Sequence, residues 1–254
     1  MIKDKTRKFF KGVYAIWYRE FKVFQREKSR VISAMFLPLF WFVIFGNGVG
    51  SISSLKINYR HFIFPGFLAM TVIFSSLFNG AYIVWDKKMD FLKEVLVTPH
   101  PRITVFIGKM VGCMTDALLQ AYILLAIGII IGIPFNPVSV LFSAIMLFVL
   151  AAGLVSLGLI IGSFMKSFEG YGILSSFIVY PLFLLSGALY PIENLPAWLR
   201  ILTHFDPATY AVDGLRHIMF GVSSMSYVTN IIVLICFDLA MIITGAWAFK
   251  RMKL

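Results

Sequence analysis

Residues 139–164 read SVLFSAIMLFVLAAGLVSLGLIIGSF, a run without a single charged side chain. An α-helix rises ~1.5 Å per residue and the hydrocarbon core of a bilayer is ~30 Å thick, so about 20 such residues cross it. We therefore predict that this run is a membrane-spanning helix.

Five further long, mostly apolar runs lie along the chain. Hydrophobic residues make up 59% of the 254 positions and charged residues only 14%, whereas a soluble domain carries about a quarter. The sequence thus predicts an all-α, polytopic integral membrane protein that forms a single domain over residues 1–254. Its six predicted transmembrane helices are residues 31–48, 62–85, 103–133, 139–164, 171–189 and 227–249.

The distribution of basic residues predicts the orientation. With the N-terminus in the cytoplasm, 19 of the 23 Lys and Arg residues fall in cytoplasmic segments and four in outer loops. Cytoplasmic loops of membrane proteins carry such an excess. We therefore expect both termini in the cytoplasm, and we interpret the net charge of +11 as a signal for orientation and anionic lipid rather than for nucleic acid.

Residues 1–30 combine ten basic residues with Phe10, Tyr14, Trp17, Phe21 and Phe24 at three- and four-residue steps. This pattern predicts an amphipathic helix that lies in the lipid headgroup region. The alternative is a helix that packs on a soluble partner. The first apolar run is too long for a signal peptide, so we expect no cleavage there.

Residues 86–102 read DKKMDFLKEVLVTPHPR and link the second and third spans. Met89, Leu92, Val95 and Leu96 form an apolar stripe, and prolines end the segment. A short amphipathic cytoplasmic helix of this kind can lie on lipid or press into a groove of a partner, and the pattern favours neither. Its candidate docking residues are Asp86, Lys88, Met89, Leu92, Lys93, Glu94, Val95, Leu96 and Pro99.

Residues 191–220 predict two short outer helices. Asn194 before Leu195-Pro196 and Asp206 before Pro207 are each typical of an N-cap followed by an early-turn proline. Neither helix is long enough to span a bilayer, so we expect an external or partly re-entrant cap, with an ordinary structured loop as the alternative. The candidate exit-gate residues are Tyr190, Pro191, Trp198, Asp206 and Pro207.

Aromatic residues share one side of the second span: Phe67, Phe74, Phe78, Tyr82 and Trp85 fall within roughly 60° of one another on a helix. The stripe could line a substrate pathway, for which Phe67, Phe74, Phe78 and Tyr82 are the candidates, but packing or lipid contact is the favoured interpretation.

Three ionisable residues lie within predicted spans: Lys109, Asp116 and Asp238. A carboxylate at the bilayer centre costs ~2.5–3.5 kcal/mol, so Asp238 should face protein or a hydrated cavity, and Lys109 could extend to the cytoplasmic surface. Pairing with polar neighbours is favoured over a proton relay.

No zinc-protease, nucleophile-elbow or Walker A motif occurs in the sequence, and no His/Cys cluster suggests a metal site. We therefore expect no catalytic residue, cofactor or metal ion in this chain. Energy for uphill transport would then come from elsewhere.

Taken as a whole, the chain resembles the ABC-2 family of membrane permeases, the transmembrane subunits of ATP-driven exporters. Two stretches carry the resemblance: FLKEVLVTPHPRITVFIGKM at 91–110 and LSGALYPIENLPAWLRILTHFDPATYAVDGLR at 185–216. They are similar to the family's segment after the second span and to its fifth-span exit with the outer helical pair.

The resemblance implies that residues 86–99 form a coupling helix that docks into a separate ATPase subunit, which binds ATP and Mg. The N-terminal helix would contact the same ATPase. Two permeases and two ATPases would form the transporter in the cytoplasmic membrane of a prokaryote, surrounded by lipid. Substrate would pass between the permeases, and the fifth span and outer helices would help to gate the exit.

The implied function is export of a hydrophobic or amphiphilic, drug-like or lipid-like compound, as in daunorubicin-resistance-type and nodulation-type exporters. Export of a polysaccharide, teichoic acid or lipid-linked oligosaccharide is the alternative within the family. An ion-coupled secondary carrier and an intramembrane enzyme using Asp116 and Asp238 are the alternatives from other classes. A carrier would show inverted repeats and several midplane charges, and the sequence has neither.

Overall fold

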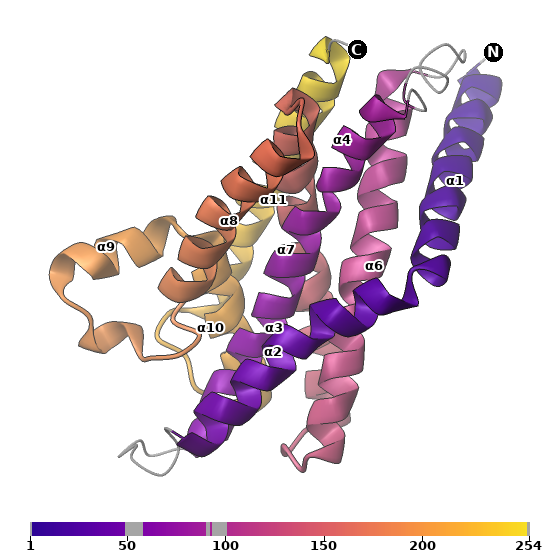
Figure 1. Ribbon diagram of the computed structural model, residues 1–254. Coiled ribbons are helices and arrows are strands. Elements are labelled where there is room, and N and C mark those ends of the chain that lie inside the picture. Colours follow the sequence, from indigo (N-terminus) through magenta and orange to yellow (C-terminus); the bar gives the residue numbers. More distant parts are fainter. Residues whose placement is uncertain (1, 49–57, 90–91, 93–100, 253–254) are drawn as a thin grey trace.

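Six helices in the computed structural model are long and apolar enough to cross a membrane. The structure describes residues 2–48, 58–89, 92 and 101–252, which contain helices and no β-strand (Figure 1). The α-helices are α1 (Ile2–Arg26), α2 (Lys28–Gly48), α3 (Tyr59–Asn79), α4 (Ala81–Lys88), α6 (Arg102–Ile130), α7 (Pro137–Phe164), α8 (Phe168–Leu185), α9 (Ala197–Phe205), α10 (Pro207–Phe220) and α11 (Tyr227–Arg251), with a 3₁₀ turn, η1, at Ile192–Asn194.

The all-α fold with six apolar helices confirms the predicted fold class. The second predicted span is two helices, α3 and α4, joined at Gly80. The fifth span ends at Leu185 rather than at residue 189, because Ser186 starts a turn in which Gly187 has a φ of 68°. A left-handed φ of this kind suits glycine and ends a helix.

Helix α3 is the centre of the bundle. Figure 1 shows α3, α4 and α7 in the middle, α1 and α6 on one side, and α8 and α9 on the other. In the most apolar window of each span, 83% of α3–α4 is buried against 17% of α2 and 22% of α8 and of α11. The outer faces of α2, α8 and α11 are therefore the surfaces left for lipid or for a second copy of the chain.

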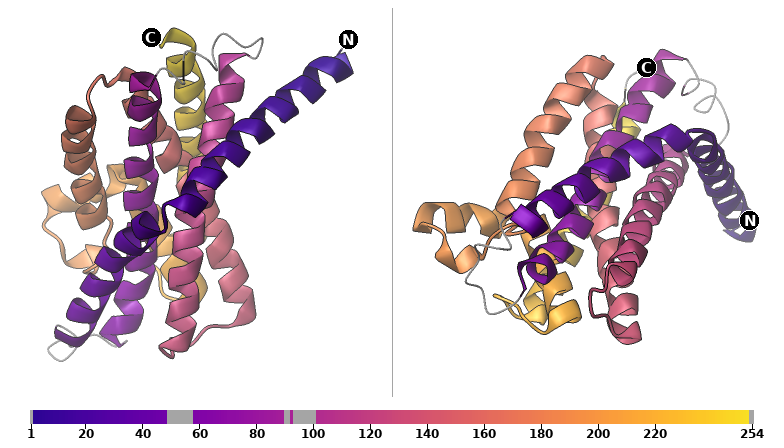
Figure 2. Two further views of the ribbon diagram at one scale, coloured as in Figure 1. Left: turned by 45° about the vertical axis from the view of Figure 1, so that its right-hand side comes forward. Right: turned by 60° about the horizontal axis from the view of Figure 1, so that its bottom comes forward.

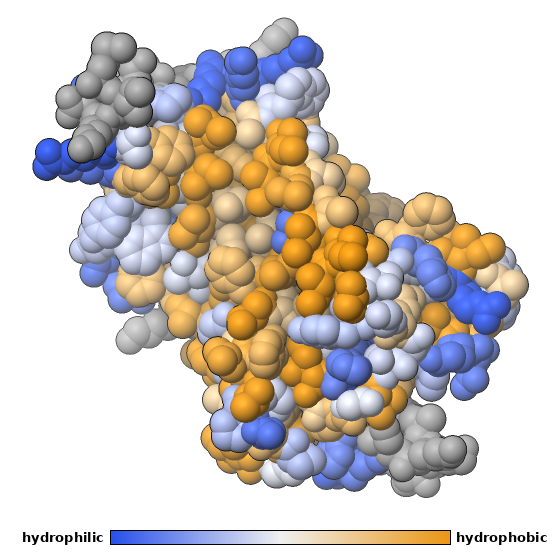
Figure 3. Space-filling view, turned by 180° about the vertical axis from the view of Figure 1, so that it is seen from behind, coloured by the Kyte–Doolittle hydropathy of each residue, from blue (hydrophilic) through white to orange (hydrophobic). Residues whose placement is uncertain are grey.

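The N- and C-terminal ends of the chain lie at the same end of the bundle (Figures 1 and 2). We call this the termini end and the opposite one the far end. Figure 3 shows hydrophobic residues over the middle of the back face and hydrophilic residues gathered toward both ends. This distribution fits a protein that crosses a bilayer.

Helix α1 packs along the half of α6 nearer the termini end (Figures 1 and 2). The indole Nε1–H of Trp17 donates to the Thr115 hydroxyl at 3.0 Å, and Phe10, Tyr14 and Tyr18 remain exposed on the other side. The amphipathic helix is therefore present, but one of its faces is covered by a membrane helix of the same chain. Its placement at the lipid surface remains a prediction.

The two far-end helices differ from each other. Helix α10 is inserted among α3, α7 and α11, and its Tyr210 and Leu215 are buried. Helix α9 projects from the side of the bundle beside α8 (Figure 1). The expected N-cap at Asn194 is wrong, since Asn194 ends η1 and Pro196 precedes α9, whereas Asp206, Pro207 and the left-handed Gly221 bound α10 as predicted.

Candidate functional site

Four charged side chains from three helices meet near the termini end. Arg19 and Glu20 come from α1, Asp86 from α4 and Lys109 from α6. The Lys109 ammonium contacts Glu20 Oε1 at 2.9 Å and also pairs with Asp86, while Arg19 contacts Glu20 at 2.8 Å and Asp86 at 2.9 Å. We call these four residues the junction network.

The junction network is mostly buried and has no net charge. The side chain of Lys109 is 1% exposed, and those of Asp86 and Glu20 are 8% and 9% exposed. The sequence left open that the Lys109 side chain extends to the cytoplasmic surface. In the structure the Lys109 ammonium is buried and does not reach it. The favoured prediction that it pairs with polar neighbours is confirmed, because a buried charge requires a paired partner.

The sequence did not identify Glu20 as a site residue. Its only signal was that it is one of three acidic residues, with Asp4 and Glu27, among the ten basic residues of 1–30. Glycines of α6 let α1 come this close: a Cβ at Gly112 would lie 2.6 Å from the Glu20 Cβ, and one at Gly108 would lie 2.7 Å from the Ile16 Cβ.

The candidate docking residues separate into an inner and an outer group. Asp86 belongs to the junction network and Leu92 is fully buried, whereas Lys88 and Met89 are exposed, Met89 by 67%. The connector at 86–102 is thus anchored at its start by α1 and α6. The remaining candidates, Lys93, Glu94, Val95, Leu96 and Pro99, lie outside the described residues.

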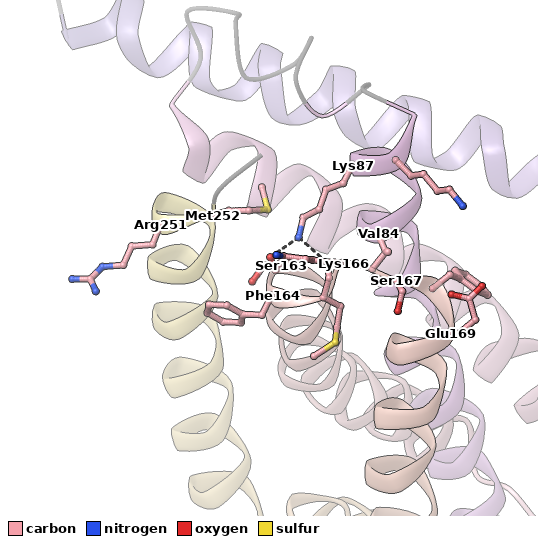
Figure 4. Close-up of a pocket in the computed structure, with 12 residues that line it drawn as sticks. Val84, Lys87, Ser163, Phe164, Lys166, Ser167, Glu169, Arg251 and Met252 are labelled. Atoms are coloured by element: carbon pink, nitrogen blue, oxygen red, sulfur yellow. Dashed lines mark hydrogen bonds between the residues drawn. The ribbon is translucent and has the colours of Figure 1, made fainter.

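A cavity of about 730 Å³ lies beside α4, between the α7–α8 turn and the end of α11 (Figure 4). Lys87 points into it and donates to the carbonyl oxygens of Gly162, Ser163 and Met165 at the end of α7. These carbonyls have no partner within their own helix, so the lysine completes the helix end.

The intramembrane acids have different surroundings. Asp116 accepts hydrogen bonds from Asn79 at 2.8 Å and from Gln120 at 2.6 Å, which confirms pairing with polar neighbours. Asp238 is 8% exposed and faces α7, where its Oδ1 lies 2.3 Å from the position of a Cβ at Gly153. As predicted, Asp238 faces protein.

The aromatic stripe of the second span divides at the α3–α4 joint. Phe67, Phe74 and Trp85 contact rings of α8, namely Phe183, Tyr180 and Phe168. The Tyr82 hydroxyl donates to Glu27 between α1 and α2 at 2.7 Å, and Phe78 is 40% exposed. These contacts favour packing for Phe67 and Phe74, and the pathway role remains a prediction.

The candidate exit-gate residues lie at the far end, in and beside the 3₁₀ turn and α9. Tyr190 donates to the Leu184 carbonyl, Pro191 precedes η1, and Trp198 is 65% exposed on α9. Asp206 caps α10 by accepting from the Ala208 N–H at 2.8 Å, and Pro207 is the first residue of that helix. Burial raises the pKa of Asp206 to about 8.

A second charged cluster, which the sequence did not reveal, secures α10. Arg216 donates to the carbonyl oxygens of Phe62 and Gly187, and its guanidinium lies 3.8 Å from the centre of the Phe62 ring. Asp213 accepts from the N–H groups of Ser224 and Met225. Burial lowers the pKa of Arg216 to about 10, and the nearby carboxylates of Asp213 and Glu193 oppose that change.

Comparison with known proteins finds a family and relatives that cover most of the chain. The pattern that defines the family "ABC-2 type transporter" matches residues 11–220. The chain is 31% identical over 237 residues to "Inner membrane transport permease YadH" of Escherichia coli (strain K12), covering 91% of this chain and 92% of that one. It is 26% identical to "Putative transport permease ycf38" of Cyanophora paradoxa, covering 96% and 89%.

A third relative is "Probable multidrug ABC transporter permease YbhR" of Escherichia coli (strain K12), which is 32% identical over 69% of this chain and 48% of its own length. The six apolar helices and these matches lead to one assignment. The chain is a multi-pass membrane permease that belongs to the ABC-2 type transporter family.

Proposed function

We propose that this permease is the transmembrane subunit of an ATP-driven exporter that moves a hydrophobic or amphiphilic compound out across the cytoplasmic membrane. A separate ATPase subunit would bind ATP and Mg, and two copies of each chain would form the complex. The observation that carries the proposal is the family match over residues 11–220, together with the junction network that anchors the connector at 86–102.

The junction network supports a mechanical role for this connector. A push on residues 86–102 reaches Asp86, and the ion pairs of Asp86 with Arg19 and Lys109 pass it to α1 and α6 together. Packed helices move as rigid elements, so such a push would shift two elements at once. The termini end is then the cytoplasmic end, and α8, α9 and α10 lie toward the exit.

The docking claim is tested at Met89, which is exposed and lies just after α4. We expect Met89→Asp to reduce co-purification of the permease with its ATPase, because a charge replaces an apolar contact in the docking segment. Val222→Asp is the matched control: it is also exposed, by 40%, but lies at the far end. Equal retention of the ATPase by both variants would refute docking through this segment.

The chemical class of the transported compound is tested by adding candidate compounds to the reconstituted complex and measuring its rate of ATP hydrolysis. We expect drug-like amines and single-chain lipids to raise the rate of ATP hydrolysis more than lipid-linked sugars do. Stimulation by lipid-linked sugars alone would instead establish the polysaccharide alternative.

A further inference from the structure

The cavity of about 730 Å³ beside α4 has an excess of positive charge. Its volume is typical of small-molecule sites, ~300–1,000 Å³. The described residues that line it include four basic side chains, from α4, the α7–α8 turn and the end of α11, and one acidic side chain: Lys87, Lys88, Lys166, Arg251 and Glu169. Among the described residues, none of these five forms an ion pair. The positive charge of the cavity is therefore not balanced by that part of the chain.

Lys87 points into this cavity (Figure 4) and is partly buried. Its ammonium has three N–H donors, and the three carbonyl oxygens at the end of α7 accept from them. These carbonyl oxygens carry no formal charge, so they satisfy the hydrogen bonds of Lys87 but do not neutralise it. A charge that is shielded from water is favourable only with a partner of opposite sign. An anion in the cavity would be that partner.

Three side chains of the lining can donate to such an anion directly. Lys88 and Lys166 are exposed, and neither donates a hydrogen bond to another described residue. The Ser167 hydroxyl accepts from the Gly170 N–H at 3.1 Å, and no described residue accepts from its own O–H. Ammonium and hydroxyl groups are donors that bind phosphate oxygens. The lining therefore suits a phosphate group.

Aromatic residues place the cavity at the level of lipid headgroups. The Lys88 ammonium lies 5.9 Å from the centre of the Trp85 ring, and the Arg251 guanidinium, which extends outward from α11 (Figure 4), lies 4.7 Å from that of Trp247. Both tryptophans are exposed, and tryptophan is enriched where a membrane meets water. Phe168 lines the cavity and is also exposed, and the largely uncovered faces of α8 and α11 continue from there. A ligand with a charged head and apolar chains would thus find a place for both parts.

We propose that the cavity binds the phosphate-bearing headgroup of an anionic phospholipid, such as phosphatidylglycerol, from the leaflet at the termini end. Lys88 and Lys166 contact the phosphate, Lys87 balances its charge, and the acyl chains lie on the outer faces of α8 and α11. An acidic segment of a soluble protein would match the charge, but it would not match the exposed aromatic and apolar side chains beside it. The lipid is a resident of the site, so the inference does not depend on the transported compound.

The test measures binding of phosphatidylglycerol to the full-length chain, purified in detergent without any ATPase, by native mass spectrometry. Phosphatidylcholine with the same acyl chains is the ligand control, because its headgroup is zwitterionic. Lys88→Gln with Lys166→Gln removes two charges from the cavity, and Lys88→Arg with Lys166→Arg keeps them. Lys8→Gln with Lys11→Gln is the matched control, because these two lysines are exposed on α1, which lies on the other side of the bundle (Figure 1), and do not line the cavity.

We expect saturable binding of phosphatidylglycerol that is tighter than that of phosphatidylcholine. The glutamine variant of the cavity should bind it at least about tenfold more weakly, since each lysine near an anionic headgroup contributes about fivefold in affinity. The arginine variant and the α1 control should bind it as the wild type does. Gel filtration checks that each variant is folded. If the double glutamine variant does not fold, Lys166→Gln alone should still weaken binding by about fivefold.

Four results would overturn the inference. The first is equal affinity for the two lipids, or equal binding by the wild type and the glutamine variant. The second is an equal loss in the α1 control, which would assign binding to the general positive charge of this end. Displacement of the lipid by inorganic phosphate would assign the cavity to a free anion, and displacement by the partner ATPase would assign it to a protein contact. Retention of the ATPase by the Met89 and Val222 variants is a separate measurement, so failure of this site leaves the proposed function untouched.

Discussion

At the scale of single residues, the protein places charge inside the bundle and neutralises it locally. Lys109 is flanked by the carboxylates of Glu20 and Asp86, and Arg19 closes the group from the solvent side. Such a buried cluster is weak evidence for stability as a whole, since desolvation offsets the attraction. Removal of one member is different, because it leaves a buried charge without its partner.

We therefore expect Lys109→Ala to destabilise the protein by about 3–5 kcal/mol, as the loss of one partner of a buried pair does. Arg19→Ala should cost about 0–1 kcal/mol, because the Arg19 side chain is 35% exposed and water screens its pairs. Unfolding of the purified chain in detergent compares the two variants. An equal loss in both would contradict the distinction between the buried and the screened member.

The buried carboxyl group of Asp206 predicts that the stability of the folded protein depends on pH. Burial raises its folded-state pKa to about 8 from an unfolded value near 3.8, so the folded protein holds a proton that the unfolded chain releases between these values. The contribution of Asp206 to stability is thus full below pH ~4 and is lost as the pH rises to about 8. The nearby Tyr190 and Tyr210 do not titrate in this window, since burial raises the pKa of each above 10.0.

The measurement is the difference in unfolding temperature between pH 5 and pH 8.5 for the wild type and Asp206→Asn. Asparagine does not titrate and still caps α10, so the variant should lose less stability on going to pH 8.5. The same loss in both proteins would mean that Asp206 is ionised in the folded state.

At the scale of elements, glycines set the distance between α3–α4 and α7. A Cβ at Gly80 would lie 2.3 Å from the Gly158 carbonyl oxygen, and one at Gly162 would lie 2.5 Å from the Gly80 carbonyl oxygen. Small residues let the backbones of membrane helices approach closely. The Tyr171 hydroxyl of α8 donates to the Leu77 carbonyl and thus binds the last turn of α3 at the same place.

We expect Gly80→Ala to destabilise the protein by about 1–3 kcal/mol, since the added methyl group meets backbone atoms that cannot move independently. Gly172→Ala on α8 is the control, because nothing lies within 4 Å of a Cβ there. It should be neutral or stabilising by less than about 1 kcal/mol, as alanine favours helix. Thermal unfolding in detergent distinguishes them, and a tolerated Gly80→Ala would show that α4 can shift away from α7.

At the scale of the whole molecule, an even number of spans returns the chain to the side on which it starts. The α7–α8 turn with Lys166 lies near the termini end, and α9, which carries Arg200, projects beside the end of α8 that faces away from the termini (Figure 1). The excess of basic residues in the segments at the termini end predicts that this end is cytoplasmic.

Cysteine labelling in intact cells tests this orientation. With Cys113 and Cys236 replaced by serine, we expect Arg200→Cys to react with a membrane-impermeant maleimide added from outside. Lys166→Cys, which is also exposed, should react only after the cells are permeabilised. Labelling of Lys166→Cys alone in intact cells would reverse the topology and, with it, the proposed site of ATPase docking.

The sequence by itself determined the all-α membrane fold, the number of spans and the cap of α10 at Asp206. These follow from local properties: the length of apolar runs, and a side chain that bonds its own neighbouring backbone. It also predicted correctly that Asp238 faces protein and that Lys109 and Asp116 pair with polar neighbours, because an isolated charge in lipid is too costly to leave unpaired.

Only the tertiary structure decided which residues those charges meet. Glu20, Asp86 and Lys109 are far apart in the chain, and no local rule pairs them; they come together because Gly108 and Gly112 admit α1 to the side of α6. In the same way, the sequence predicts both α9 and α10 as short outer helices, yet α10 enters the bundle and α9 stays outside. Contacts between distant segments depend on the shape of both surfaces, and the sequence of one helix specifies only one of them.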